Sequence, residues 1–170
     1  MKDLLQRLIA QDRALTQRLT MPAGSRWRWL PALGAHLGDG ALWFAIGGAL
    51  LIWGTSTQRR IAWSACLFVL ASTGISTAIK YLVRRPRPQE LTQFYAVKHD
   101  RYAFPSGHAT RMGAIAVAIG HWVPQWAPLA YALAVLVALC RVVVGVHYAS
   151  DVIVGLAIGF VGAGCVLLAS

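Results

Sequence analysis

The chain has 170 residues, of which 57% are hydrophobic and only 13% are charged. Soluble domains typically carry about 45–50% apolar and about 25% charged residues, so this composition argues against a soluble globular domain. The formal net charge of +10 lies on segments beside apolar stretches that contain no nucleic-acid-binding motif. We therefore expect membrane lipids with anionic headgroups, and not nucleic acid, as partners.

The N-terminal segment Met1–Thr20 is predicted to form an amphipathic helix that does not cross the membrane. Its apolar stripe consists of Leu4, Leu5, Leu8, Ile9, Leu15 and Leu19. The other faces are too polar for a spanning helix, so we expect this helix to lie in the headgroup layer. The alternative is a solvated helix that packs on the protein's own loops. Residues 1–25 are accordingly assigned to an interfacial helix and residues 26–170 to a membrane domain.

Five apolar stretches follow, and a helix needs roughly 20 residues to cross a bilayer. They predict an all-α integral membrane bundle of about five transmembrane helices, near residues 32–54, 61–83, 106–123, 127–146 and 149–169. Within the first stretch, Asp39 could cap a helix or pair with an arginine, and we favour the cap. Within the last, Gly155 and Gly159 predict close packing inside the bundle.

Five spans would place three polar regions on one face of the membrane: the N-terminus, the loop 84–105 and the turn near Tyr148. Among the 16 Lys and Arg residues, only Arg59 and Arg60 would lie on the other face. Because positively charged loops tend to stay in the cytoplasm, this distribution favours a cytoplasmic location for the polar face.

The first polar cluster follows the second stretch. Lys80 is near the end of a predicted helix, and Pro86 and Pro88 then favour an extended backbone that would present Arg85 and Arg87 to the same face. The planar guanidinium group can hold two phosphate oxygens at once. The alternative is that these cations only reach toward lipid headgroups.

The second cluster, Pro105-Ser106-Gly107-His108, opens the third stretch. Pro and Ser favour a helix start, where free amides and the positive end of the helix dipole attract anions. Gly107 would allow close approach of a bound group, and His108 could donate a proton to a departing oxygen. The alternative is an ordinary helix cap with an interfacial histidine.

The third cluster comprises Arg141, His147 and Asp151. His147 and Asp151 are four residues apart, so they can lie on one face of a helix. The carboxylate could accept a hydrogen bond from one imidazole nitrogen and leave the other nitrogen free for nucleophilic attack. The alternative is a pair that merely closes a helix junction, but charged groups within membranes usually serve a function.

Together, Lys80-x6-Arg87-Pro88, Pro105-Ser106-Gly107-His108 and Arg141-x5-His147-x3-Asp151 resemble the three-part signature of the type 2 phosphatidic acid phosphatase superfamily. These are integral-membrane lipid phosphatases related to vanadium haloperoxidases. The resemblance covers residues 80–151.

The resemblance implies a role for each of these positions. His147 would attack phosphorus to form a phosphohistidine, Asp151 would orient His147, and His108 would protonate the leaving oxygen. It also implies that the phosphate is bound, without a metal or other cofactor, by Lys80, Arg87, Ser106, Gly107 and Arg141.

One position departs from the family pattern, because Cys140 replaces the serine that precedes the arginine of the third motif. A thiol is a weaker hydrogen-bond donor than a hydroxyl, so this phosphate contact is in question. Cys140 could also be an alternative nucleophile, but its place at the end of an apolar stretch favours simple packing.

The predicted function is hydrolysis of a lipid phosphomonoester or diphosphate by a multi-pass protein of the cell membrane. Four substrates fit: a polyprenyl diphosphate, phosphatidylglycerol phosphate, phosphatidic acid or a polyprenyl-phosphoryl sugar phosphate. We expect selectivity to come from the loop 84–105 and from the cleft between helices. The alternative function is a non-catalytic protein that binds anionic lipids, or a phospholipid transporter. The sequence leaves self-association into a homo-oligomer open.

Overall fold

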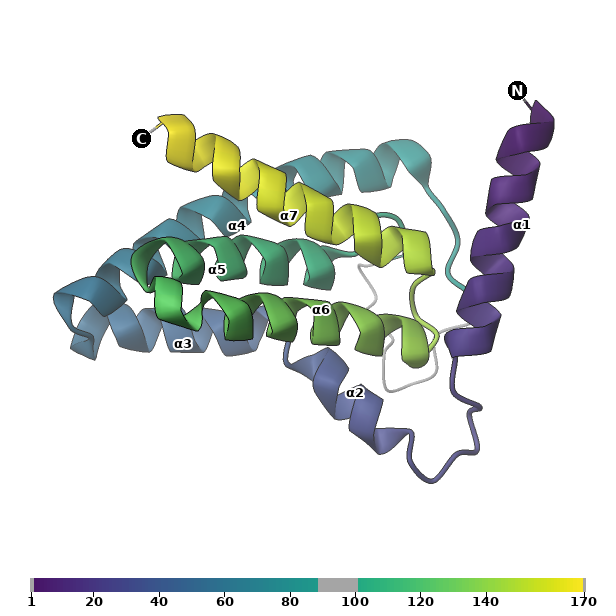
Figure 1. The fold of residues 1–170 in the computed structure, drawn as a ribbon, viewed down its shortest axis with the longest axis horizontal. Helices are drawn as coiled ribbons and strands as arrows, with labels where there is room; N and C mark the ends of the chain where they lie inside the picture. The colour runs from purple at the N-terminus through teal and green to yellow at the C-terminus, as the bar shows by residue number, and fades with distance from the viewer. Residues whose placement is uncertain (1, 89–100, 170) are drawn as a thin grey trace.

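A computed structural model describes residues 2–88 and 101–169 of the chain, and the regular elements within these ranges are all helices (Figure 1). They are α1 (Lys2–Leu19), α2 (Trp29–His36), α3 (Gly40–Trp53), α4 (Ser56–Val83), α5 (Gly107–Trp122), the 3-10 turn η1 (Pro124–Trp126), α6 (Ala127–Val143) and α7 (Ala149–Ala169). The predicted all-α class is confirmed. Residues 89–100, the larger part of the loop expected to contribute to selectivity, lie outside the described ranges.

Helix α5 is the centre of the bundle and packs against α4, α6 and α7 (Figure 1). Small residues make this close packing feasible. A Cβ atom added to Gly155 would lie 2.6 Å from the carbonyl oxygen of Ser106, and one added to Gly159 would meet the carbonyl oxygen of Thr110. The two glycines therefore let α7 approach the backbone of α5, which confirms their predicted role inside the bundle.

The outer surface of the bundle is apolar. Within the described part of the chain, three helical segments are long and apolar enough to cross a membrane: Ser56–Val83, Pro124–Val143 and Ala149–Leu168. Only 17% to 33% of the residues in their most apolar windows are buried inside the protein, so most of these side chains face outward. An apolar surface of this extent suits a lipid environment, and the chain is a multi-pass membrane protein.

The first predicted span is not one continuous helix. It is divided into α2 and α3, which are bent by 45° at a break over residues 37–39. At the break, a Cβ atom on Gly38 would lie 2.7 Å from Val137 Cγ1, and the Gly38 carbonyl accepts a 2.6 Å hydrogen bond from Arg111 Nη1. The amides of Gly38 and Asp39 bond to the carbonyls three residues back, while the Gly38 carbonyl is bonded by the Arg111 side chain.

The five spans expected are not all identified by helix length and composition among the described residues. The described residues contain three spanning helices, or four spans if the bent pair α2–α3 counts as one. Helix α5 has 16 residues and is too short to be counted among the three. The prediction of five membrane crossings is not confirmed.

Helix α1 lies across the end of the bundle where α6 finishes and α7 starts (Figure 1). It forms within the predicted segment, and its side chains Leu4, Leu8 and Leu15 are exposed. Thr16, by contrast, is only 2% exposed because this part of α1 contacts the bundle. A helix is thus present at the predicted position, whereas its assignment as an interfacial helix in the headgroup layer stays a prediction.

Candidate active site

The three polar clusters meet at the same end of the bundle. Helices α4 and α6 end there, and α5 and α7 begin there (Figure 1). This alternation of up and down helices brings residues separated by more than forty positions into contact. An example is the backbone amide of Ser106, which donates a 3.0 Å hydrogen bond to the backbone carbonyl of Asp151.

The arginine-proline segment leaves α4 as expected. Arg84 adopts a left-handed conformation, with φ of 50°, and terminates the helix. Arg87 then reaches the junction between α6 and α7, where its Nη1 donates a 3.0 Å hydrogen bond to the carbonyl of Val146. Arg85 reaches the same junction and donates from its Nη1 to Asp151 Oδ1 at 2.9 Å. Both guanidinium groups therefore point toward the third cluster.

The start of α5 has the geometry that its sequence predicts. Ser106 is fully buried, and its hydroxyl accepts a 3.5 Å hydrogen bond from the amide of Ala109, so it caps the helix. The peptide bond between Phe104 and Pro105 is cis. Because α5 begins at Gly107, the amides of its first turn and the positive end of its dipole lie at the site.

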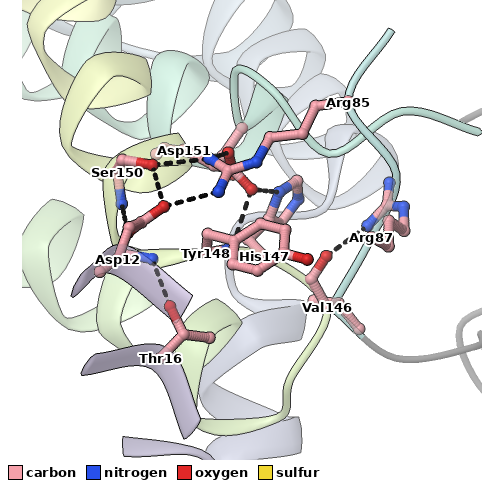
Figure 2. A network of polar contacts seen from close by, with 12 residues as sticks. Asp12, Thr16, Arg85, Arg87, Val146, His147, Tyr148, Ser150 and Asp151 are labelled. Atoms are coloured by element: carbon pink, nitrogen blue, oxygen red, sulfur yellow. Dashed lines mark hydrogen bonds and ion pairs between the residues drawn. The ribbon is translucent and has the colours of Figure 1, made fainter. Parts of the chain in front are cut away.

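His147 and Asp151 form a completely buried pair (Figure 2). His147 Nδ1 lies 3.6 Å from Asp151 Oδ2, which is longer than an N–H···O hydrogen bond. Among the described residues, neither ring nitrogen of His147 has a hydrogen-bond partner. Asp151 Oδ2 also accepts a 2.8 Å hydrogen bond from the amide of Tyr148, which fixes the carboxylate beside the ring. Nδ1 thus faces the carboxylate, and Nε2 is buried without a hydrogen-bond partner among the described residues.

The electrostatics of His147 link all three clusters. Burial lowers the pKa of His147 well below its ordinary value of 6.5, and the positive charges of Arg141, Arg87 and Lys80 lower this pKa further. His108 acts in the same direction. Four predicted site residues are therefore close enough to lower the pKa of His147. Its imidazole is neutral at pH 7, and this is the form in which a ring nitrogen can attack.

His108 is paired with Asp39, which the sequence analysis placed in a helix cap. Asp39 precedes α3, but its side chain makes no capping hydrogen bond. Its Oδ1 lies 2.8 Å from His108 Nε2, and its Oδ2 lies 2.7 Å from His36 Nδ1. The capping prediction for Asp39 is wrong, because the break between α2 and α3 turns the carboxylate toward α5.

Two further residues of this region were not predicted as site residues. Arg85 bridges Asp151 and Asp12 of α1, and its Nη2 lies 2.7 Å from Asp12 Oδ2 (Figure 2). The proline pattern pointed to Arg85 as well as Arg87, but it did not identify the partner of either. No local pattern marks Asp12, because it lies on the polar side of an ordinary amphipathic helix.

Cys140 packs between helices. It is buried with Ala35, Val144 and Val146, and its Sγ lies so close to α2 that a Cβ atom on Gly34 would be 2.5 Å away. This contact supports packing as the role of the thiol.

The described part of the chain contains no group of three or more His, Cys, Asp or Glu side chains that could hold a metal ion. The polar atoms at this end of the bundle are instead mostly cationic and amide groups, which suit an anion such as phosphate.

Comparison with known proteins gives matches to one family. Residues 61–170 match the family model described as the PAP2 superfamily. Decaprenylphosphoryl-5-phosphoribose phosphatase of Mycobacterium tuberculosis is 37% identical over 158 residues, which cover 89% of this chain and 82% of that protein.

Two solved structures share the fold. The crystal structure of Aquifex aeolicus LpxE has a TM-score of 0.74, with 22% identity, and the match covers 91% of this chain and 93% of that one. The crystal structure of a transmembrane PAP2 type phosphatidylglycerolphosphate phosphatase from Bacillus subtilis has a TM-score of 0.68, also with 22% identity, covering 96% and 88%.

Proposed function

The chain belongs to the PAP2 superfamily and is a membrane lipid phosphatase, and from this premise we propose that it hydrolyses its substrate through a phosphohistidine on His147 without a metal ion. The observation that carries the proposal is the buried pair of His147 and Asp151. An imidazole whose Nδ1 faces a carboxylate, and whose Nε2 has no partner among the described residues, is suited to nucleophilic attack.

In the first step, His147 Nε2 forms a bond to phosphorus while the bond between phosphorus and the lipid oxygen breaks. His108 transfers a proton to that oxygen, and the carboxylate of Asp151 stabilises the positive charge on the His147 ring. In the second step, water gives a proton to His108 and its oxygen bonds to phosphorus. The N–P bond breaks, and inorganic phosphate and neutral His147 are released.

The phosphate oxygens would be held by five residues around this pair: Lys80, Arg87, Ser106, Gly107 and Arg141. Two observations support this role. Lys80, Arg87 and Arg141 all lie within electrostatic range of His147, and Arg141 also interacts electrostatically with His108. Ser106 and Gly107 are at the start of α5, where helix amides favour an anion.

Among the four predicted substrate classes, we favour a polyprenyl-phosphoryl sugar phosphate. The Mycobacterium tuberculosis relative is named for a decaprenylphosphoryl-5-phosphoribose substrate, and its match covers most of both chains. The other three classes are compared with this substrate in the activity test below.

We also propose that α1 lies in the headgroup layer, as a segment of residues 1–25 beside the membrane domain 26–170. Its position across the bundle end and its exposed leucines support this placement. The bent pair α2–α3 and the short α5 would complete five crossings. At 1.5 Å per residue, the 16 residues of α5 extend about 24 Å, and the surrounding helices shield them from lipid. The distribution of Lys and Arg favours the cytoplasmic face for the site.

The test is phosphate release in detergent from the four lipid classes. We expect His147→Ala to lower kcat by at least about 10³-fold and His108→Ala by about 10²–10⁴-fold. His121→Ala is the matched control, because His121 is exposed at the opposite end of α5 and should leave activity unchanged. Activity should persist in EDTA.

A brief reaction with phosphorus-labelled substrate, quenched with alkali, should leave label on the parent protein and none on His147→Ala. Phosphate release by His147→Ala at the parental rate would overturn the assignment of the nucleophile. No release by the parent from any substrate would overturn the proposed reaction and favour lipid binding or transport.

A further inference from the structure

Helix α1 is attached to the proposed site by polar contacts (Figure 2). Thr16 Oγ1 accepts a 3.1 Å hydrogen bond from the amide of Ala149, the first residue of α7. Asp12 Oδ1 accepts a 3.0 Å hydrogen bond from the amide of Ser150, and Asp12 Oδ2 accepts a 2.6 Å hydrogen bond from the Ser150 hydroxyl. The first amides of a helix have no partner within it, so α1 supplies the acceptors for the start of α7.

The same Asp12 is linked to the proposed catalytic carboxylate through one guanidinium group. Arg85 Nη2 lies 2.7 Å from Asp12 Oδ2, and Arg85 Nη1 lies 2.9 Å from Asp151 Oδ1. The guanidinium also covers the ring of Tyr148, with 3.8 Å between Cζ and the ring centre. Arg85 is thus fixed between two carboxylates from helices α1 and α7, and it is only 19% exposed.

We propose that Asp12 is a positioning residue for the phosphatase reaction. Because Asp12 also binds the Arg85 guanidinium, Arg85 neutralises the charge of Asp151 only in part, and the remaining negative charge stabilises the His147 ring when it attacks phosphorus. This inference rests on the proposed function, because it assumes that His147 and Asp151 react as described there.

Charge balance is the physical basis of the proposal. Two carboxylates and one guanidinium have a net charge of −1, and the member of this group beside the His147 ring is Asp151, whose Oδ2 lies 3.6 Å from Nδ1. Without Asp12, Arg85 and Asp151 would sum to zero, and the stabilisation of the charged ring would decrease. Asp12 is suited to remain ionised. Burial raises its pKa, but hydrogen bonds from Ser150 and Arg85 outweigh burial and lower its pKa overall.

The geometry of Asp151 adds a second reason. Its Oδ1 accepts the hydrogen bond from Arg85, whereas its Oδ2 faces His147 and the amide of Tyr148. If Arg85 lost Asp12, Asp151 would be its one remaining carboxylate partner beside the 2.7 Å hydrogen bond to the Ser150 hydroxyl, and a two-pronged contact with both oxygens of Asp151 would become more favourable. Arg85 would then neutralise more of the negative charge on Asp151 Oδ2, the oxygen that faces His147.

The experiment compares kcat, KM and the pH profile of phosphate release for the parent and for Asp12→Asn in detergent. Asn preserves the size of the side chain and one acceptor oxygen but removes the charge. We expect kcat to fall by about 10- to 100-fold, the range typical of partners one step removed from the reacting group, with KM within about twofold. The acid limb of kcat/KM should move to lower pH, because removal of a nearby negative charge makes His147 harder to protonate.

Two further variants separate charge sharing from simple docking of α1. Asp12→Asn combined with Arg85→Gln restores a net charge of −1, so the double variant should recover several-fold of the kcat lost in Asp12→Asn. Asp12→Glu preserves the charge and should retain most of the parental kcat. Asp3→Asn is the matched control, because Asp3 is an exposed carboxylate on the same helix and should behave as the parent.

The inference is overturned if Asp12→Asn has the parental kcat, or if the double variant is no more active than Asp12→Asn. If Asp12→Asn does not fold, the comparison of Asp12→Glu with the double variant decides the question, since charge sharing requires both to be active. His147→Ala serves as the reference for the proposed function. A parent whose activity is lost in His147→Ala supports that function whatever Asp12→Asn shows, whereas a parent without activity overturns both proposals.

Discussion

Replacement of Gly159 by alanine tests the close packing of α5 and α7 on which the site is built. The added Cβ would meet the carbonyl oxygen of Thr110, and it would lie 3.0 Å from the amide nitrogen of Ala114 and 3.1 Å from the Gly113 Cα. All three are backbone atoms, which cannot rotate away, so the helices must separate. Overpacking costs typically about 1–3 kcal/mol, whereas alanine in place of glycine within a helix contributes about 1 kcal/mol of stability.

Because all three contacts of the added Cβ are with backbone atoms, we place the overpacking cost in the upper part of its range, about 2–3 kcal/mol. After the helix contribution of about 1 kcal/mol, the net expectation for Gly159→Ala is a loss of roughly 1 to 2 kcal/mol, which corresponds to a decrease in Tm of about 2–8 °C for a chain of this length. The assay is thermal unfolding in detergent, with phosphate release measured on the same samples. Gly164→Ala is the matched control, because Gly164 is on the same helix and no atom lies within 4 Å of its added Cβ. Its Tm should equal or exceed that of the parent. An unchanged or higher Tm for Gly159→Ala would refute the packing argument.

Three other predictions concern the site. The depressed pKa of His147 keeps the ring neutral as the pH falls, so activity should be lost only below pH 6.5, and an acid limb of kcat/KM above 6.5 would contradict this assignment. Cys140→Ala should change kcat by less than about threefold, because the substitution removes a buried packing contact and leaves the proposed reacting groups in place. A loss of kcat as large as that of His147→Ala would instead identify the thiol as a nucleophile. Asp39→Asn should lower kcat by about 10- to 100-fold through His108, and parental activity in this variant would show that the contact does not position the ring.

Local sequence patterns predicted most of the helices and the position of the site. Apolar stretches located α4, α6 and α7, since a membrane span requires a long uncharged segment. Ser106 indicated the start of α5, because a serine hydroxyl satisfies a helix amide. The spacing of His147 and Asp151 favoured a contact between them, although His147 precedes α7, which begins at Ala149. The three motifs together indicated the family that the comparisons show.

The break between α2 and α3 could not be predicted from the same patterns. The segment is apolar on average, although His36, Gly38, Asp39 and Gly40 interrupt it. At the break, Gly38 packs against Val137 of α6, and its carbonyl accepts a hydrogen bond from Arg111 of α5. Neither partner is a neighbour in sequence. The error in the role of Asp39 has the same cause, because its partner His108 lies 69 positions further along the chain.

The sequence by itself thus determined the family and pointed to the residues proposed to react with phosphate, because motif spacing and helix capping depend on neighbours only a few positions apart. The tertiary structure alone decided how these residues are supported. Asp12 and Arg85 are 73 positions apart, and they meet only because α1 lies across the bundle end where α7 begins. Such pairs depend on the packing of whole helices, which no periodicity within a single helix encodes.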